Sequence, residues 1–119
     1  PFPMVADANM KVANLFGMIH PGASSTVTVR AVFVIDPKRV VRALIYYPLN
    51  VGRQVDEVVR LVDALQTTDK HSVATPVNWK VGDKVVVPPP KTVKDVAERG
   101  THKEYERLDF YLNKKNLPA

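Results

Sequence analysis

Two apolar runs joined by a turn signal constrain this chain more than any other feature of its sequence. The first run, from Thr26 to Asp36, alternates apolar side chains onto one face at the period of a β-strand. In "DPKR", Asp36 and Pro37 occupy the positions that type I turns favour. The return run "VVRALIYYP" is closed by Pro48, which cannot donate to a ladder of strand hydrogen bonds. The pattern predicts a long β-hairpin.

A positive charge stands in the middle of the first predicted strand. Arg30 lies on the face opposite Val29, Ala31 and Phe33, which are the apolar neighbours that the alternation groups together. A half-buried guanidinium is costly unless an anionic group meets it, because burial removes its hydration. Arg30 is therefore the first candidate functional residue. The alternative is an arginine that only covers the edge of a strand.

The segment "GRQVDEVVRLVDALQ", residues 52–66, has the clearest helical pattern. Its apolar side chains recur at helical spacing and form one stripe. Asp56 and Glu57 suit the positive end of the helix dipole, whereas Arg53 at the same end does not. Arg53 is therefore either placed by another constraint or an exposed arginine whose stem packs on the surface.

The remaining segments have weaker patterns. "PFPMVAD", residues 1–7, predicts a short strand that ends at Asp7, a residue suited to cap a helix. The next segment, residues 8–18, predicts a short helix that Gly17 ends. A loop, "HPGASS", leads into the hairpin. The predicted order is thus strand, helix, two hairpin strands, helix and a C-terminal arm.

The C-terminal part changes character after Leu65. It is rich in turn formers and contains the run Pro88–Pro90, which favours extended polyproline geometry. Trp79 and the valines of "KVVVP" are apolar anchors that disfavour a disordered tail. We expect an extended arm that packs against something such as a partner subunit, with Thr75 to Pro90 too proline-rich to fold on itself.

Composition excludes several classes of function. The 119 residues include no cysteine, so disulfides, thiolate metal sites and thiol catalysis within this chain are excluded. The three histidines lie far apart, and no metal site or cofactor is expected. The net charge of +5 is dispersed among alternating basic and acidic residues, so no nucleic-acid partner is expected.

Membrane and export signals are also not expected to act here. The apolar runs are about as long as strands, far below the roughly 20 residues that span a bilayer. No basic-then-apolar leader with a cleavage site is visible. The chain begins Pro1-Phe2-Pro3 without a methionine, which indicates a trimmed or partial polypeptide.

The predicted elements do not close into a complete fold. A first strand followed by a helix expects a parallel neighbour reached through a crossover. The hairpin is apolar on both faces, so both faces expect cover. Two helices and an arm are thin cover for it, and part of the fold is therefore expected to be missing.

The motifs together resemble a known family. The segments "FPMVAD", "LFGM", "TVRAVFVID", "YYPLNVGRQVDEVVRLVDALQ" and "VATPVNWKVGDKVVVPPP" are similar, in order and spacing, to the second half of a one-cysteine type peroxiredoxin. The resemblance covers the chain from Phe2 to about Thr92. It implies an α/β fold, namely the C-terminal half of a thioredoxin-like fold, residues 1–70, followed by the extended C-terminal dimerisation arm, residues 71–119.

The resemblance also implies what lies outside the chain and what the arginines do. The peroxidatic cysteine of the family belongs to the half that is missing here. Arg30 matches the arginine that points into the active site beside the cysteine sulfur and the peroxide oxygens. Arg53 matches the arginine of the "GR" segment at the mouth of the same site. Tyr46, Tyr47 and Pro48 match the family's "YYP" and are expected to position the strand end.

The implied parent protein reduces hydrogen peroxide and organic hydroperoxides, with an external thiol as reductant. This chain would supply active-site arginines and dimer contacts, and by itself is expected to be inactive. The family forms homodimers through the hairpin's return strand, alone or as a ring of dimers, and each arm covers the partner's active site. A cytoplasmic location is expected. The alternative is a non-catalytic dimerisation or holdase-like fragment.

Two departures from known subgroups limit what is carried over. Some family members have a lipase-like serine, histidine and aspartate set, but the position of that aspartate is Lys38 here, so no phospholipase activity is inferred. Some relatives have a cysteine pair around an aromatic tail segment, whereas "ERLDFYLNKK" has no cysteine. The departure favours a parent with a single catalytic cysteine.

Overall fold

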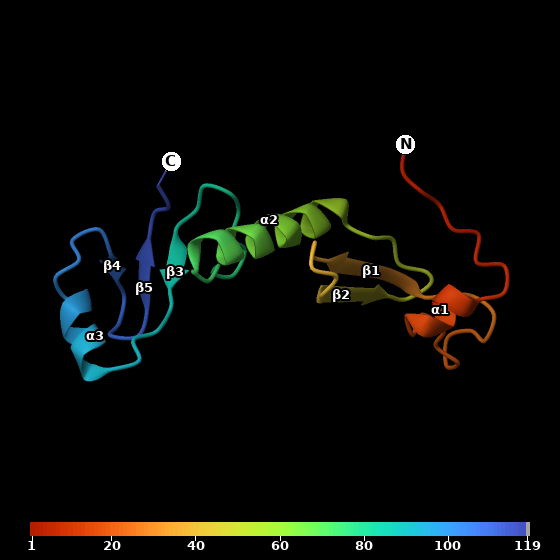
Figure 1. Cartoon of the computed structure of the whole chain (residues 1–119), viewed down its shortest axis with the longest axis horizontal. Helices are drawn as coiled ribbons and strands as arrows, with labels where there is room; N and C mark the ends of the chain where they lie inside the picture. The colour runs from red at the N-terminus through yellow and green to blue at the C-terminus, as the bar shows by residue number, and fades with distance from the viewer. Residues whose placement is uncertain (119) are drawn as a thin grey trace. The chain divides into compact units, whose positions relative to one another are not determined.

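The computed structural model describes residues 1–118. They form two compact units, Pro1–Gln54, which we call the hairpin unit, and the C-terminal unit, which starts at Val55. The elements of each are labelled in Figure 1. These units follow packing within this chain, and the division into domains 1–70 and 71–119 stays a prediction about the whole fold.

The hairpin unit contains the predicted β-hairpin. Strand β1, Arg30–Ile35, pairs antiparallel with β2, Val41–Tyr47. In the turn, Asp36 Oδ1 accepts hydrogen bonds from the backbone N–H groups of Lys38 and Val40, at 2.8 and 3.0 Å. Arg39 has a φ of 66°, and the register shifts between Val34 and Ile35. The hairpin prediction is confirmed, although β1 begins later than the alternating pattern.

A short helix, α1, Lys11–Leu15, precedes the hairpin. The carboxylate of Asp7 accepts hydrogen bonds from the N–H groups of Val12 and Ala13, at 2.9 and 2.8 Å. Asp7 therefore satisfies donors that the first turn leaves free, but the prediction that it is the N-cap residue is wrong, because Met10 occupies that position. Gly17 follows the helix with a φ of 62°, a conformation that glycine adopts without steric cost.

The predicted strand over residues 1–7 is wrong. The structure assigns no strand to these residues, and Phe2 and Met4 are more than four-fifths exposed. A strand needs a neighbour to receive its backbone hydrogen bonds, and the hairpin sheet of the described residues consists of β1 and β2 only. The local pattern indicated a strand, but a local pattern does not show whether a neighbouring strand is present.

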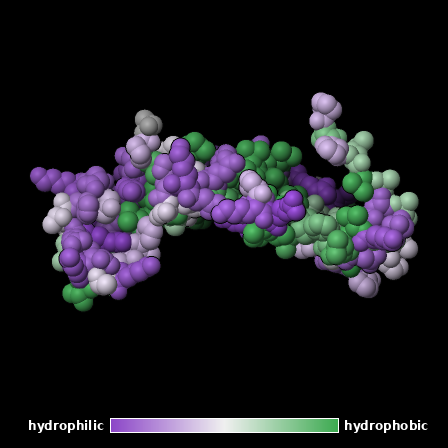
Figure 2. Space-filling view, in the orientation of Figure 1, coloured by the Kyte–Doolittle hydropathy of each residue, from purple (hydrophilic) through white to green (hydrophobic). Residues whose placement is uncertain are grey.

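The hairpin unit packs one side around an aromatic group and leaves much apolar surface exposed. Phe33 meets Phe16 edge to face at 5.1 Å between ring centroids, and meets Tyr46 at 6.0 Å. Leu44 and Val41 of β2 are nevertheless about half exposed. Figure 2 shows hydrophobic surface where the hairpin lies. The unit buries few side chains fully, as expected for a hairpin that needs further cover.

The C-terminal unit begins with α2, Val55–His71. Asp56 and Glu57 lie in its first turn, as predicted, but the helix continues beyond the predicted end at Gln66. No proline or glycine interrupts residues 66–71. The hydroxyl of Thr68 donates to the carbonyl of Leu65 at 2.9 Å, so this polar residue is accommodated within the helix.

The rest of this unit is a small sheet and a short helix. Strands β3, Val85–Val87, β5, Asn113–Lys115, and β4, Glu106–Arg107, are antiparallel in the order β3-β5-β4. Helix α3, Val93–Arg99, starts with a capping box in which Thr92 and Asp95 exchange hydrogen bonds. These bonds, with one from the backbone of Lys91, hold the pKa of Asp95 below its usual value.

The expectation that Thr75 to Pro90 is too proline-rich to fold on itself is wrong. Trp79 is 2% exposed and Val85 is fully buried, in one cluster with Ala64 of α2 and with Val73. The prolines do not interrupt the sheet, because the run Pro88–Pro90 follows β3 instead of standing within it. The segment's apolar anchors are therefore buried within its own chain.

Residues 1–118 contain neither a cluster suited to a metal ion nor a helix suited to span a membrane. No group of three or more histidine, aspartate or glutamate side chains is placed to hold a metal ion within this range. The helices described there are all too short or too polar to cross a membrane.

Candidate functional site

The first candidate residue, Arg30, lies at the beginning of β1. The register places it opposite Tyr47, the last residue of β2, so the loop that follows β2 returns beside it. Its Nε donates a hydrogen bond to the carbonyl oxygen of Leu49 at 3.1 Å. Arg30 as a whole is exposed to solvent. Its guanidinium is nevertheless held against the loop by this hydrogen bond.

The second candidate, Arg53, belongs to the same loop and reaches back to the strand. Its Nη2 donates to the carbonyl oxygen of Ala31 at 3.3 Å. Arg30 is thus held by the carbonyl of Leu49, close in sequence to Arg53, and Arg53 is held by the carbonyl of Ala31, next to Arg30. The structure brings together the two residues that the sequence singled out, although they are more than 20 positions apart.

Both arginines line one open depression of about 350 Å³. The loop residues Leu49, Asn50 and Val51, together with Gly52, complete its wall. Asn50 is exposed and offers both a donor and an acceptor. The depression therefore combines two guanidinium groups, one amide and two apolar side chains. The catalytic role of Arg30 and Arg53 stays a prediction.

Two contributors to this site were missed by reading the sequence. The carbonyl of Leu49, which holds Arg30, gives no signal in a side-chain pattern. Asn50 is a common loop residue, and only its position between Pro48 and the "GR" segment could have drawn attention to it. The hydroxyl of Tyr46 donates to the carbonyl of Phe16 at 3.4 Å, and its role in positioning the strand end stays a prediction.

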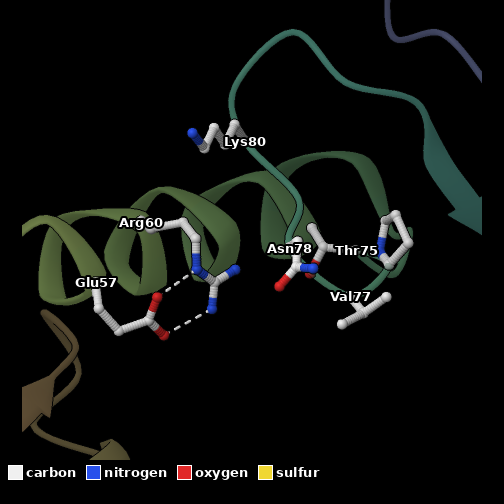
Figure 3. Close-up of a pocket in the computed structure, with 7 residues that line it drawn as sticks. Glu57, Arg60, Thr75, Val77, Asn78 and Lys80 are labelled. Atoms are coloured by element: carbon white, nitrogen blue, oxygen red, sulfur yellow. Dashed lines mark hydrogen bonds and ion pairs between the residues drawn. The ribbon is translucent and has the colours of Figure 1, made fainter.

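A larger hollow of about 680 Å³ lies in the C-terminal unit, between α2 and the loop that carries Asn78 and Lys80 (Figure 3). Its guanidinium, from Arg60, is already neutralised. Arg60 Nε and Nη2 donate to the two carboxylate oxygens of Glu57, at 2.6 and 2.8 Å, and Nη1 donates to the carbonyl of Trp79 at 3.5 Å. These bonds from Arg60 hold the pKa of Glu57 below its usual value.

The two hollows therefore differ in charge. In the C-terminal hollow the arginine is matched by a carboxylate in a two-point contact, which fixes the side chain and cancels its charge. In the hairpin unit neither Arg30 nor Arg53 has a carboxylate partner within residues 1–118. The depression of the hairpin unit is the better candidate for chemistry with an anion.

Two family models of peroxiredoxin type match different parts of this chain. The family described as "C-terminal domain of 1-Cys peroxiredoxin" matches residues 64–104, and the AhpC/TSA family matches residues 1–44. A peroxiredoxin of Aquifex aeolicus is 51% identical over 98% of this chain and 57% of its own length. Peroxiredoxin 2 of Caldanaerobacter subterraneus is 49% identical over 94% of this chain and 51% of its own length.

Solved structures agree as well. A yeast mitochondrial 1-Cys peroxiredoxin superposes with a TM-score of 0.81 at 37% identity, over 98% of this chain and 56% of the other. A cysteine-to-serine mutant of Peroxiredoxin 6 of Arenicola marina gives a TM-score of 0.79 at 32% identity, over 99% and 57%. The predicted fold class, part of a thioredoxin-like α/β fold with its C-terminal extension, is confirmed.

The chain spans about half the length of the relatives it matches. It contains no cysteine. The sequence identity and the structural likeness extend over nearly the whole of it, through the hairpin unit and the C-terminal unit alike. This chain belongs to the peroxiredoxin family.

Proposed function

We propose that this chain is the arginine-bearing part of a thiol-dependent peroxidase that reduces hydrogen peroxide and organic hydroperoxides. The nucleophile is a peroxidatic cysteine that lies outside this chain, in the remainder of the same protein. The observation that carries the proposal is the pair Arg30 and Arg53, held at one depression in a member of the peroxiredoxin family.

The reaction needs a positive charge that is fixed in place. The cysteine thiolate attacks one peroxide oxygen, an S–O bond forms as the O–O bond breaks, and the second oxygen leaves with the electron pair and takes up a proton. The sulfur is oxidised to a sulfenic acid and the peroxide is reduced to water or an alcohol. Arg30 favours the thiolate, and so lowers the pKa of the thiol, and stabilises the charge that develops on the leaving oxygen.

An external thiol completes the cycle. It attacks the sulfenic acid, releases water and forms a mixed disulfide, which a second thiol reduces. The yeast mitochondrial 1-Cys peroxiredoxin has a thiol resolving mechanism that uses glutathione and thioredoxin systems. A reductant of that class is proposed here too, because the arm segment "ERLDFYLNKK" offers no second cysteine.

The test compares the chain with the full-length protein that contains the cysteine. Full-length protein should turn over peroxide with a thiol reductant, and changing its peroxidatic cysteine to serine should abolish turnover. The 119-residue chain alone should show none, because it has no thiol nucleophile. Peroxide consumption followed in a coupled assay checks this. Multiple turnovers by the cysteine-free chain, or none by the full-length protein, would refute the proposal.

We further propose that the full-length protein is a homodimer, alone or within a ring of dimers. Strand β2 pairs with β1 on one side, its other edge is unpaired within residues 1–118, and it has no charge after Arg42. An apolar edge of this kind is normally paired or covered. The arm's Val77, 88% exposed, is an apolar contact available for the partner near its Arg53.

The expected result of light scattering on full-length protein at micromolar concentration is the mass of a dimer or of a multiple of it. A stable interface of this kind buries more than about 1,200 Å² in total. Leu44 is about half exposed on β2, and Leu44→Lys should weaken the dimer if that strand takes part. A strict monomer would contradict the proposal. A cytoplasmic location stays a prediction.

The alternative, a non-catalytic dimerisation or holdase-like fragment, is favoured by the exposed apolar side chains of the hairpin unit. This alternative assigns no role to Arg30 and Arg53. A full-length protein that dimerises but consumes no peroxide would favour this alternative.

A further inference from the structure

The small sheet of the C-terminal unit buries one polar side chain. Asn113, the first residue of β5, is 1% exposed, and it pairs with Val87 of β3 on one side and with Arg107 of β4 on the other. Residues directly opposite each other in an antiparallel pair project from the same face of the sheet. The amide of Asn113 therefore shares a face with Val87, whose side chain is also buried.

Neither polar atom of this amide has a partner. Nδ2 and Oδ1 form no hydrogen bond within residues 1–118, and almost none of their surface can be reached by water. The residues that enclose the amide belong to this chain itself. Neither solvent nor a polypeptide packed on the outside of the unit can therefore supply a partner while the sheet is closed.

A third unpartnered atom lies in the same part of the chain. Arg99 of α3 donates from Nη2 to the carbonyl of Pro88, the residue that follows β3, whereas its Nη1 is inaccessible and has no partner. Asn113 and Arg99 provide all the inaccessible, unpartnered side-chain nitrogen and oxygen atoms of half-buried or buried residues within 1–118. The polar mismatch is thus confined to the chain that follows β3.

Little else within this chain holds β5 in place. The strand has only three residues, "NKK", which have low strand propensity. Leu117 packs against the buried Trp79 cluster and favours the closed sheet. Closing the sheet, however, takes from the Asn113 amide the hydrogen bonds to water that it has when the sheet is open, and burying an unpaired amide is unfavourable.

We propose that β5 is a releasable strand, which detaches from β3 while the rest of the C-terminal unit stays folded, and that Asn113 sets how often this happens. Local opening occurs where the closed state is least stabilised. Release returns the amide to water and frees the edge of β3 that β5 covers. The other edge of β3 stays bonded to Ala74.

The two edges of β3 give separate readouts of release. The N–H of Val86 donates to the carbonyl of Ala74 at 2.8 Å, and its carbonyl accepts from the N–H of Ala74 at 2.9 Å. Backbone groups of successive strand residues face alternate edges, so the N–H groups of Val85 and Val87 face β5. Release should therefore expose these two amides to hydrogen exchange and leave the amide of Val86 protected.

The experiment is amide hydrogen exchange, resolved by residue with mass spectrometry and fragmentation. It uses the full-length protein, in which the remainder of the fold is present, and the 119-residue chain. After correction for intrinsic rates, the amides of Val85 and Val87 should exchange at least about tenfold faster than that of Val86. This comparison within the unmodified protein needs no variant.

Two variants test the role of Asn113. Asn113→Leu keeps the branched shape of the side chain without its polar atoms, and should slow exchange at Val85 and Val87 at least about tenfold, because the open state no longer gains two solvated groups. The rate at Val86 should not change. Asn113→Val makes the same test with a smaller side chain, should the methyl groups of leucine overpack the site.

Asn116→Leu is the matched control. It makes the same replacement at an exposed position just beyond β5 and should leave all three rates unchanged. Circular dichroism shows that each variant is folded. Equal exchange of the three amides in the unmodified protein would overturn the proposal, and so would folded Asn113 variants that slow Val85 and Val87 by less than about threefold. The peroxidase proposal stands apart from these outcomes, because exchange of backbone amides does not involve turnover.

Discussion

Replacing Trp79 by alanine is expected to lower the free energy of unfolding by about 3–5 kcal/mol, the usual cost of truncating a large buried aromatic side chain. Trp79 is 2% exposed and packs with Ala64, Val73 and Val85 in the buried cluster of the C-terminal unit. Its removal leaves a cavity between α2 and β3 that the small neighbours cannot fill. Urea unfolding followed by circular dichroism measures the loss, because the variant has no tryptophan left for fluorescence.

Matched variants separate packing from hydrogen bonding in this prediction. Trp79→Phe keeps a ring in the cluster but loses the bond from Nε1 to the carbonyl of Asp83, 3.1 Å away. It should cost distinctly less, because Asp83 is exposed and its carbonyl can bond water instead. Val77→Ala, at an exposed position of the same loop, should change stability by less than about 0.5 kcal/mol. A loss below about 1 kcal/mol for Trp79→Ala would mean that the segment does not pack as described.

The same residue shows where reading the sequence succeeded and where it failed. Trp79 was correctly expected to be buried, since a large apolar side chain among turn formers needs cover. What covers it could not be predicted, because the partners are distant in the chain. Strand β3 pairs with β5 through Val85 and Lys115, and "NKK" has neither alternation nor high strand propensity. Pairing of this kind is decided by tertiary contacts.

Local signals predicted the hairpin unit better. The turn at Asp36 and the alternating strands are encoded within about 20 neighbouring residues, so the hairpin could be predicted closely. The strand prediction for residues 1–7 failed because it rested on local propensity, and the hairpin sheet of the described residues has no third strand to pair with that segment. In the peroxiredoxin family the chain's relatives are about twice as long, which agrees with the predicted lack of cover.

The candidate site was predictable because its residues break local rules. Arg30 is a charge in an apolar strand, and Arg53 is a cation at the positive end of a helix. Conflicts of this kind are typical of functional sites, and a functional role for these two residues stays a prediction. The backbone carbonyls of Leu49 and Ala31 hold these arginines. A pattern of side chains cannot predict such contacts, because they depend on the backbone geometry. Side-chain identity could thus indicate the site, but its arrangement had to come from the structure.

Replacing Arg30 by alanine in the full-length protein is expected to slow the oxidation of the cysteine by peroxide about 10²–10³-fold, the cost of losing one donor to a developing oxyanion. The prediction rests on the proposed function. Two effects act together, because the thiolate loses a stabilising charge and the leaving oxygen loses its hydrogen bonds. The thiol pKa should therefore rise in the variant, which a merely structural residue would not cause. Stopped-flow measurement of sulfenic acid formation against pH gives both quantities.

Controls distinguish this role from a loss of structure. The bond from Arg30 to Leu49 lies at the surface, so Arg30→Ala should change the free energy of unfolding by no more than about 1 kcal/mol. Arg30→Lys keeps the charge but not the planar donor pair, and should recover part of the thiol pKa and less of the rate. Arg39→Ala, in the hairpin turn, should leave both unchanged. A rate loss of only a few-fold for Arg30→Ala, with an unaltered thiol pKa, would remove Arg30 from the mechanism and leave the depression without a catalytic task.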